Sequence, residues 1–291
     1  MTIYFQLVKF GIVIFVVLAG LAGYATSFAV ETVFSWQHLL NFIGGIYFLC
    51  AGSLALNQVQ EWKSDQKMPR TAKRPIASGK MSPTAAAILA VAHIAIGSDL
   101  LFKTSELAGL FGWLTILLYN VVYTYWWKPK WVFGAVPGAI PGALPVTIGY
   151  VANDPNFMAS DSIYLFLIMF LWQMPHFWVL AIRYKDDYAK GLVPTMPVAL
   201  GVNKTIFHIG LYTFAYVAIA VSSPLFVHSS WVYILFVMPF VFKILQEFYR
   251  FQKSQGAERW FAFFMWVNIS MLVFIFVPVI DKWNFLFIGS N

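Results

Sequence analysis

Residues 57–82, NQVQEWKSDQKMPRTAKRPIASGKMS, form a charge-dense stretch (the polar segment) in a chain that is otherwise apolar. The segment holds two carboxylates and six lysines or arginines, whereas charged residues make up only 11% of the whole chain. Long apolar runs flank it on both sides. We therefore expect the polar segment to lie at a membrane surface, where hydrophobic helices end and water begins.

The composition as a whole points to the same class of protein. Apolar residues account for 60% of the 291 positions and aromatic residues for 19%, and the mean hydropathy is +0.72. These values exclude an ordinary soluble domain. A single cysteine, Cys50, excludes an intramolecular disulfide and a cysteine-based metal cluster. The prediction is an all-α polytopic membrane protein, with residues 1–291 forming one integral-membrane domain.

The apolar runs give the number of spans. A membrane helix needs roughly 20 mostly apolar residues, and about nine such runs occur. The first is too long for a signal-peptide core and is expected to be retained. The predicted spans are 10–30, 37–57, 84–102, 107–127, 132–151, 161–183, 205–223, 231–250 and 260–280.

The basic residues fall in alternate loops, and only Lys103 and Lys282 lie on the opposite side. The positive-inside rule then places the N-terminus and the polar segment in the cytoplasm, in a protein of the cell inner membrane. The net charge of +7 is therefore attributed to topology and to anionic head groups of the lipid bilayer or an anionic substrate. Nucleic acid is not an expected partner.

Three polar side chains in the polar segment share a spacing of four residues. Asn57, Glu61 and Asp65 would line one face if the second span continues beyond the bilayer as a helix. Their oxygens are ligands that Mg²⁺ accepts when substrate phosphates complete its shell. The alternative is a solvated helix end in which an arginine pairs with an acid.

The basic residues that follow suit phosphate binding. Lys67, Arg70, Lys73 and Arg74 can hold phosphate oxygens, and Lys128 at the end of the fourth span is placed to do the same. Positive-inside topology alone is the competing explanation. Carboxylates and cations within one loop favour a diphosphate site.

A second polar cluster closes the sixth span. Asp186 and Asp187 are adjacent, so on a helix they point about 100° apart, and Asp187 is favoured as the one that faces the polar segment. Gln173 and His176 lie within the apolar run, where polar side chains are costly and often functional. A hydrogen-bonded histidine in the protein interior is the alternative for His176. The Gly- and Pro-rich run 134–149 predicts a narrow, kinked fifth span, which allows either close helix packing or space for a bulky ligand.

These motifs resemble those of the UbiA superfamily of membrane prenyltransferases. The first motif is Asn57-x3-Glu61-x3-Asp65 with the basic residues up to Arg74-Pro75. The stretches from Trp172 to Trp178 and from Lys185 to Pro197, together with Tyr123 to Lys128, are similar to the haem-farnesylating branch of that superfamily. The resemblance covers residues 41–201. Departures occur at Gln58 and Lys63, where relatives often carry acids, at Pro129, which replaces an arginine, and at Arg183.

The resemblance implies a UbiA-like helical bundle around a central cavity. It also implies transfer of a farnesyl group from farnesyl diphosphate to a vinyl group of haem B, which gives haem O. In that reading Mg²⁺ is held by Asn57, Glu61, Asp65 and Asp187, and these four with Lys128 are the catalytic residues. The diphosphate is bound by Lys67, Arg70, Arg74 and Lys128, and haem by His176 and Gln173. Haem-pathway or oxidase-assembly proteins would be partners.

Two other functions remain open from the sequence. The acceptor could be an aromatic quinone precursor, as in other branches of the superfamily. A non-catalytic transporter or oxidase assembly factor is a weaker alternative, because transporters usually place ionisable groups near mid-membrane, whereas here they gather at the span ends.

Overall fold

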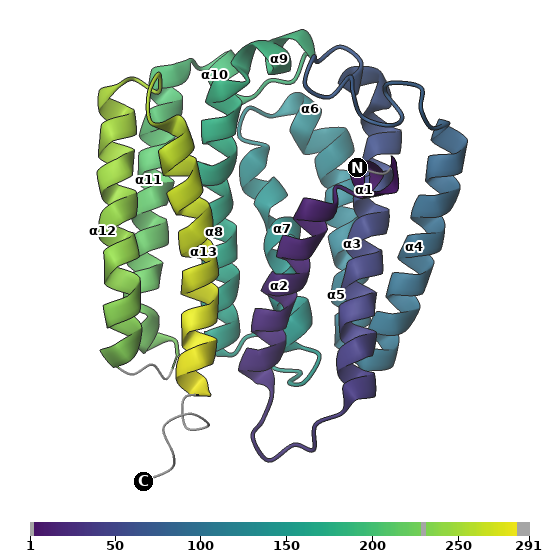
Figure 1. Cartoon of the computed structure of the whole chain (residues 1–291), viewed down its shortest axis with the longest axis vertical. Coiled ribbons are helices and arrows are strands. Elements are labelled where there is room, and N and C mark those ends of the chain that lie inside the picture. The colour runs from purple at the N-terminus through teal and green to yellow at the C-terminus, as the bar shows by residue number, and fades with distance from the viewer. Residues whose placement is uncertain (1–2, 228–230, 284–291) are drawn as a thin grey trace.

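The computed structural model describes residues 3–227 and 231–283, and these residues form helices with no strand. Long helices run roughly parallel to one another, and short helices and loops join them at the ends (Figure 1). The long helices are α2 (Phe10–Ser27), α3 (Trp36–Asp65), α4 (Pro83–Thr104), α5 (Glu106–Ile116) continued by η1 (Leu117–Trp127) and α6 (Lys128–Lys130), α7 (Ala135–Tyr150), α8 (Ser160–Arg183), α11 (Val202–Val221), α12 (Trp231–Lys253) and α13 (Trp260–Lys282). The short elements are α1 (Ile3–Leu7), α9 (Lys185–Lys190), α10 (Met196–Ala199) and η2 (Ser223–Leu225).

The expected all-helical membrane fold is confirmed. Within the described residues, seven helices are long and apolar enough to cross a membrane. The two other predicted spans correspond to α7, which has only 16 residues, and to α12, whose second half carries several charges. Both run alongside the seven (Figure 1), so the estimate of about nine spans describes the bundle well.

Four helices occupy the middle of the bundle. Helix α2 packs against α7 and α13, and α8 packs against α7 and α13. Helices α3, α4 and α5 lie on one side of this group, and α11 and α12 lie on the other (Figure 1). The bundle therefore has two flanks that meet at the α2, α7, α8 and α13 group.

Glycines allow the middle helices to approach closely. A Cβ at Gly149 of α7 would overlap the carbonyl of Gly20 in α2, and one at Gly23 would overlap the backbone at Val146. Helix α7 also contains Pro141 and Pro145 in its interior. The expected close packing of the Gly- and Pro-rich span is thus observed, because small residues bring helix backbones together.

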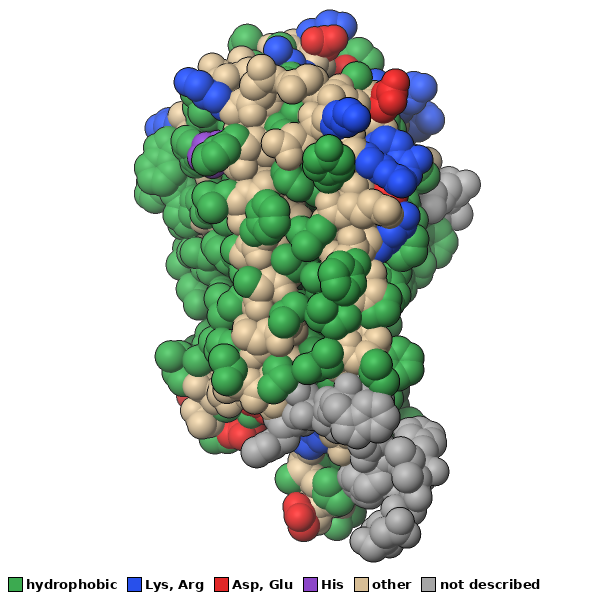
Figure 2. Space-filling view, turned by 90° about the vertical axis from the view of Figure 1, so that its left-hand side faces the viewer, with side chains coloured by type: hydrophobic (Ala, Val, Ile, Leu, Met, Phe, Trp, Pro, Cys, Tyr) green, Lys and Arg blue, Asp and Glu red, His purple; other side chains and the backbone are tan. Residues whose placement is uncertain are grey.

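Charge is unevenly distributed along the bundle. Lysine and arginine side chains gather at one end, and the waist of the molecule is almost entirely hydrophobic (Figure 2). The basic end is the one that carries α9 and α10 in Figure 1. A broad apolar band below a basic end is the surface that a membrane-spanning bundle requires.

Candidate active site

Helix α3 carries the first half of the site because it is longer than the membrane is thick. It has 30 residues, which at 1.5 Å per residue span about 45 Å, against a hydrocarbon core of about 30 Å. The last turns therefore rise out of the apolar band. Asn57, Glu61 and Asp65 occupy one face of these turns, as expected from their spacing.

Both carboxylates on this face form close ion pairs with basic residues from other segments. The Lys128 ammonium lies 2.5 and 2.6 Å from the two carboxylate oxygens of Glu61. One guanidinium nitrogen of Arg74 lies 2.8 and 2.7 Å from the two oxygens of Asp65. The tertiary structure thus brings predicted metal ligands and predicted phosphate-binding cations together in one place.

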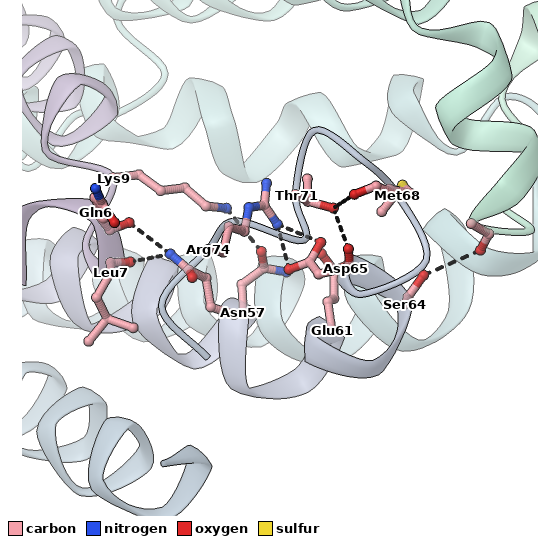
Figure 3. A network of polar contacts seen from close by, with 12 residues as sticks. Gln6, Leu7, Lys9, Asn57, Glu61, Ser64, Asp65, Met68, Thr71 and Arg74 are labelled. Carbon is pink, nitrogen blue, oxygen red and sulfur yellow. Dashed lines mark hydrogen bonds and ion pairs between the residues drawn. The ribbon is translucent and has the colours of Figure 1, made fainter. Parts of the chain in front are cut away.

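A further lysine reaches this site from the N-terminus. Lys9 follows α1 in the left-handed conformation, with φ 51°, and its ammonium donates to Asn57 Oδ1 at 3.2 Å (Figure 3). The amide of Gln58 donates to the carbonyls of Gln6 and Leu7 and so fixes the turn that presents Lys9. Burial lowers the pKa of Lys9 to about 7, with the positive charge of nearby Arg74 as a lesser cause.

Sequence reasoning did not assign Lys9 to the site. The available signal was a lone lysine just before the first apolar run, on the same predicted side as the polar segment. That signal fits membrane topology equally well. Only the fold of the N-terminal segment over α3 reveals the contact with Asn57.

Amide side chains hold α3 and η1 in register. Asn57 donates to Thr124 Oγ1 at 3.3 Å. The Asn120 side-chain oxygen accepts from the Ser53 hydroxyl, and its amide nitrogen donates to the Ser53 backbone carbonyl and to the Gln60 side-chain oxygen. The Gln60 amide donates to the Asn120 backbone carbonyl. Helix η1 is a π-helix, a rare form that often marks functional sites. These bonds fix the helix whose end delivers Lys128 to Glu61.

The second polar cluster, on α9, contacts the polar segment. Asp187 Oδ2 accepts from the backbone N–H of Arg70 at 3.2 Å, and the Arg70 guanidinium lies over the rings of Tyr184 and Tyr188 at 5.0 and 5.8 Å. Asp186 is exposed on the other face. The structure therefore turns Asp187 toward the polar segment and Asp186 to solvent.

A cavity of about 410 Å³, hereafter the polar cavity, has Glu61, Asp65, Arg70, Arg74 and Lys128 in its wall. Asn57, Asp187 and Lys9 do not line it. It opens at the basic end of the bundle. Its carboxylates and cations can hold a divalent ion and a diphosphate side by side.

Other basic residues of the polar segment do not line this cavity. Lys67 and Lys73 are exposed, and neither belongs to the cavity wall. Lys63, the cation among the expected ligands, is also exposed, with its ammonium 5.7 Å from the Trp62 ring. Lys63 therefore lies on a different face of α3 from Glu61, and its side chain points away from the site.

An apolar cavity of about 220 Å³, hereafter the apolar slot, lies deeper in the bundle. Leu54, Cys50, Tyr119 and Gln173 contribute to its wall. The ring of Tyr119 stacks on that of Tyr123, which lines the polar cavity, at 5.8 Å between centroids. The two tyrosines mark the junction between the polar cavity and the apolar slot. The Gln173 amide donates to two backbone carbonyls, each at 3.0 Å.

His176, a residue of α8, contacts α13 and is held in one tautomer. Its Nδ1 is 2.8 Å from Asn268 Oδ1, and the Asn268 amide nitrogen donates to the carbonyl of Phe264. Because Asn268 Oδ1 can only accept, His176 Nδ1 carries the hydrogen and Nε2 carries a lone pair. The ring stands between Trp172 and Phe264, at 4.7 and 4.9 Å. The hydrogen bond to Asn268 therefore leaves the Nε2 lone pair of His176 free to accept.

Comparison with known proteins identifies relatives along the whole chain. The model of the UbiA prenyltransferase family matches residues 13–269. A protein of Bdellovibrio bacteriovorus named protoheme IX farnesyltransferase is 65% identical over 289 residues, which is 99% of either chain. Protoheme IX farnesyltransferase 1 of Pseudomonas fluorescens is 32% identical over 281 residues, covering 94% of this chain and 92% of that protein.

Solved structures share the fold at low sequence identity. A UbiA homologue from Aeropyrum pernix superposes with a TM-score of 0.73 and 16% identity, covering 97% of this chain and 99% of the other. A homologue from Archaeoglobus fulgidus, bound to DMAPP and Mg²⁺, gives 0.67 and 15%, covering 96% and 99%. These two comparisons support the helical architecture around the polar cavity and the apolar slot.

Proposed function

Because the chain belongs to the UbiA prenyltransferase family, we propose that it transfers a farnesyl group from farnesyl diphosphate to a vinyl group of haem B, which gives haem O. The relative named protoheme IX farnesyltransferase, identical at 65% of 289 positions, supports this donor and acceptor. The observation that carries the proposal is the polar cavity with its paired carboxylates and cations, whose wall meets that of the apolar slot at the stacked rings of Tyr119 and Tyr123.

The cations of the polar cavity would bind the diphosphate. Arg74 and Lys128 are held at its wall by Asp65 and Glu61, so their charges are in place before the substrate arrives. Lys9 adds an ammonium that donates to Asn57. Preorganised cations stabilise the negative charge that develops on a departing diphosphate, and they do so best where water is excluded.

The oxygen donors of the site fit Mg²⁺. Asn57, Glu61 and Asp65 present an amide and two carboxylates on one face of α3, and Asp187 stands across the polar segment from them. Within the described residues, no group of three or more His, Cys, Asp or Glu forms a cage. Mg²⁺ is usually held by one or two carboxylates together with substrate phosphates, and Glu61 and Asp65 would supply these carboxylates. When bound, the ion supplies positive charge to the leaving diphosphate.

The transfer proceeds by ionisation of the donor. The bond between C1 and the diphosphate oxygen breaks, and its electron pair leaves with the diphosphate. The stacked rings of Tyr119 and Tyr123 offer π-faces to the allylic cation. The haem vinyl group then forms the new carbon–carbon bond. Water adds to the resulting cation and loses a proton to give the hydroxyl group.

His176 would position the haem. Its Nε2 lone pair faces away from the Asn268 bond that fixes the tautomer, and an axial imidazole ligand would orient the porphyrin. Gln173 lies three residues before His176 on α8 and lines the apolar slot. The two residues would place the vinyl group near the junction marked by Tyr119 and Tyr123.

The protein is an integral membrane protein, with seven helices capable of spanning a bilayer among the described residues. We propose that the basic end faces the cytoplasm of a cell with an inner membrane, because lysine and arginine concentrate there (Figure 2). Both substrates would then meet at the inner face of the membrane.

Product identification tests the proposal. Purified protein, farnesyl diphosphate, haem B and Mg²⁺ are incubated, and the porphyrin products are separated and weighed by mass spectrometry. Haem carrying one added farnesyl group and one added hydroxyl group is the expected product. A prenylated aromatic acid, formed when haem is replaced by a quinone precursor, would instead assign the alternative acceptor. No prenylated product with either acceptor would overturn the enzymatic assignment.

A further inference from the structure

The turn between α12 and α13 surrounds an open cleft of about 510 Å³, hereafter the basic cleft. It lies at the basic end of the bundle (Figure 1) and shares no wall residue with the polar cavity. Three of its wall residues are cations and one is a carboxylate, so the wall carries a net positive charge. The residues that line it are Arg250, Lys253, Ser254, Ala257, Glu258 and Arg259.

A buried carboxylate holds both arginines of this wall. Glu247 of α12 is 0% exposed, and its oxygens accept from Arg250 at 3.2 Å and from Arg259 at 2.8 to 3.1 Å. The two arginine side chains nevertheless remain 46% and 45% exposed. Because a guanidinium carries five N–H groups, both arginines keep donors for a ligand in the basic cleft.

The backbone of the turn keeps Arg259 in place. Its φ of 63° lies in the left-handed region, which a long side chain seldom adopts. The Ser254 hydroxyl accepts from the backbone N–H of Glu258 at 3.1 Å and closes the turn just before it. A strained conformation persists where the surrounding structure holds it, and such residues cluster at binding sites. The bonds from Arg259 to Glu247 therefore preorganise this guanidinium at the wall.

More cations gather here than the carboxylates need. Lys243 also pairs with Glu247, at 2.9 Å, and Lys253 lines the basic cleft without an ion pair in the part of the chain that the structure describes. The two arginines and these two lysines outnumber Glu247 and Glu258. Topology requires only that basic residues lie on one side of the membrane, and it does not require a buried carboxylate that orders them. The arrangement favours a ligand with several anionic oxygens, such as a phosphate group.

Below the basic cleft, α12 presents an exposed apolar stripe. Leu235, Phe242 and Tyr249 follow one another at intervals of seven residues, which places them on one helical face, and they are 61%, 65% and 64% exposed. The stripe is about 21 Å long at 1.5 Å per residue, enough to accompany an acyl chain through one leaflet of a bilayer. Lys253 continues the face one turn beyond Tyr249. Figure 2 looks at the flank that carries α11 and α12, with hydrophobic side chains over most of it and basic side chains toward its upper end.

We propose that the basic cleft binds the phosphate group of an anionic phospholipid, whose acyl chain lies along the apolar stripe of α12. The free N–H groups of Arg250 and Arg259 donate to the phosphate oxygens, and the Lys253 ammonium adds positive charge. A zwitterionic phospholipid binds more weakly, because the cation of its head group is repelled by the same wall. The site does not depend on the proposed prenyl transfer, since the basic cleft and the polar cavity share no residue.

A lipid titration tests the proposal. Delipidated protein in non-ionic detergent receives phosphatidylglycerol, phosphatidylcholine or sodium phosphate, and native mass spectrometry gives the fraction of protein that carries each. Wild type should bind phosphatidylglycerol roughly tenfold or more tightly than phosphatidylcholine. Arg250→Gln combined with Lys253→Gln should remove this preference. Lys80→Gln combined with Lys130→Gln is the matched control, because it removes the same charge at exposed positions outside the basic cleft, and it should keep the preference.

The outcomes separate the possible occupants. An equal loss of phosphatidylglycerol binding in the cleft variant and in the control would attribute binding to net charge alone and overturn the proposal. Displacement of phosphatidylglycerol by an equal concentration of sodium phosphate would also overturn it, in favour of free phosphate. Lys253→Gln alone breaks no ion pair among the described residues, so it tests the site even if the double variant is unstable. It should lower the affinity for phosphatidylglycerol roughly fivefold, and an unchanged affinity would count against the proposed site.

Discussion

The ammonium of Lys9 donates to the side-chain oxygen of Asn57 at 3.2 Å, although the two residues are 48 positions apart in the chain. The contact joins the turn before the first span to the polar face of α3 (Figure 3). It places a half-buried lysine beside an expected metal ligand and within the electrostatic reach of Glu61 and Asp65. The N-terminal segment is therefore part of the site.

Replacement of Lys9 should weaken use of the diphosphate substrate. For Lys9→Met we expect a kcat/KM for farnesyl diphosphate lowered roughly ten- to a hundredfold, the loss typical of one hydrogen bond to a charged group. Initial rates of farnesyl-haem formation measure the effect. Lys63→Met is the matched control, because Lys63 is exposed and contacts only the Trp62 ring among the interactions described. Equal rates in the two variants would remove Lys9 from the site.

Neutralising a carboxylate of α3 should lower the rate of product formation more than removing one cation does. Glu61→Gln loses the ion pair with Lys128 and one oxygen ligand, so product formation should fall about a hundredfold or more. Asp99→Asn is the control, because Asp99 pairs with Lys103 on an exposed surface at the other end of α4. Normal turnover by Glu61→Gln would contradict the metal and diphosphate assignment.

Removal of divalent metal should abolish transfer without unfolding the bundle. Treatment with EDTA is expected to reduce product to background, and added Mg²⁺ to restore it, because the protein supplies oxygen donors but no complete cage. Circular dichroism in detergent checks that the helices persist. Asp187→Asn should raise the Mg²⁺ concentration needed for half-maximal rate. Activity that survives EDTA in fully chelated protein would exclude the proposed role of the metal.

Haem binding should depend on His176. We expect His176→Ala to lower the apparent affinity for haem roughly tenfold or more, because the Nε2 lone pair is lost. A titration followed by the visible spectrum of haem measures this affinity. His208→Ala is the control, since the His208 ring packs against Trp178 and Phe133 at distances of 6.2 and 5.2 Å. If both variants gave the same haem titration, His176 would have only a structural role, in joining α8 to α13 through Asn268.

One ion-pair cluster should affect stability and not prenyl transfer. The Glu247 carboxylate is fully buried and forms ion pairs with Lys243, Arg250 and Arg259. Glu247→Gln should lower the free energy of unfolding by about 2 kcal/mol, less than for a fully buried pair because the cations remain partly hydrated. Thermal melts in detergent measure this effect. Glu258→Gln, at an exposed position, should leave the melting temperature unchanged.

The sequence alone determined the span positions and the polar face of α3. Predicted span 37–57 lies within α3 and predicted span 84–102 within α4, because the length of an apolar run is a local property set by the thickness of the membrane. The four-residue spacing of Asn57, Glu61 and Asp65 likewise fixes one helical face once the helix continues to Asp65. These features depend only on neighbours along the chain.

The tertiary structure decided which of the basic residues face that helix. Lys128 reaches Glu61 from 67 positions away and Lys9 reaches Asn57 from the N-terminus, whereas Lys67 stays exposed within the polar segment itself. The positive-inside rule depends on the side of the membrane where a lysine or arginine lies and not on the direction of its side chain, so the sequence does not tell which cations face α3. Only the packing of helices that are distant in the sequence determines which cations lie beside Glu61, Asp65 and Asn57.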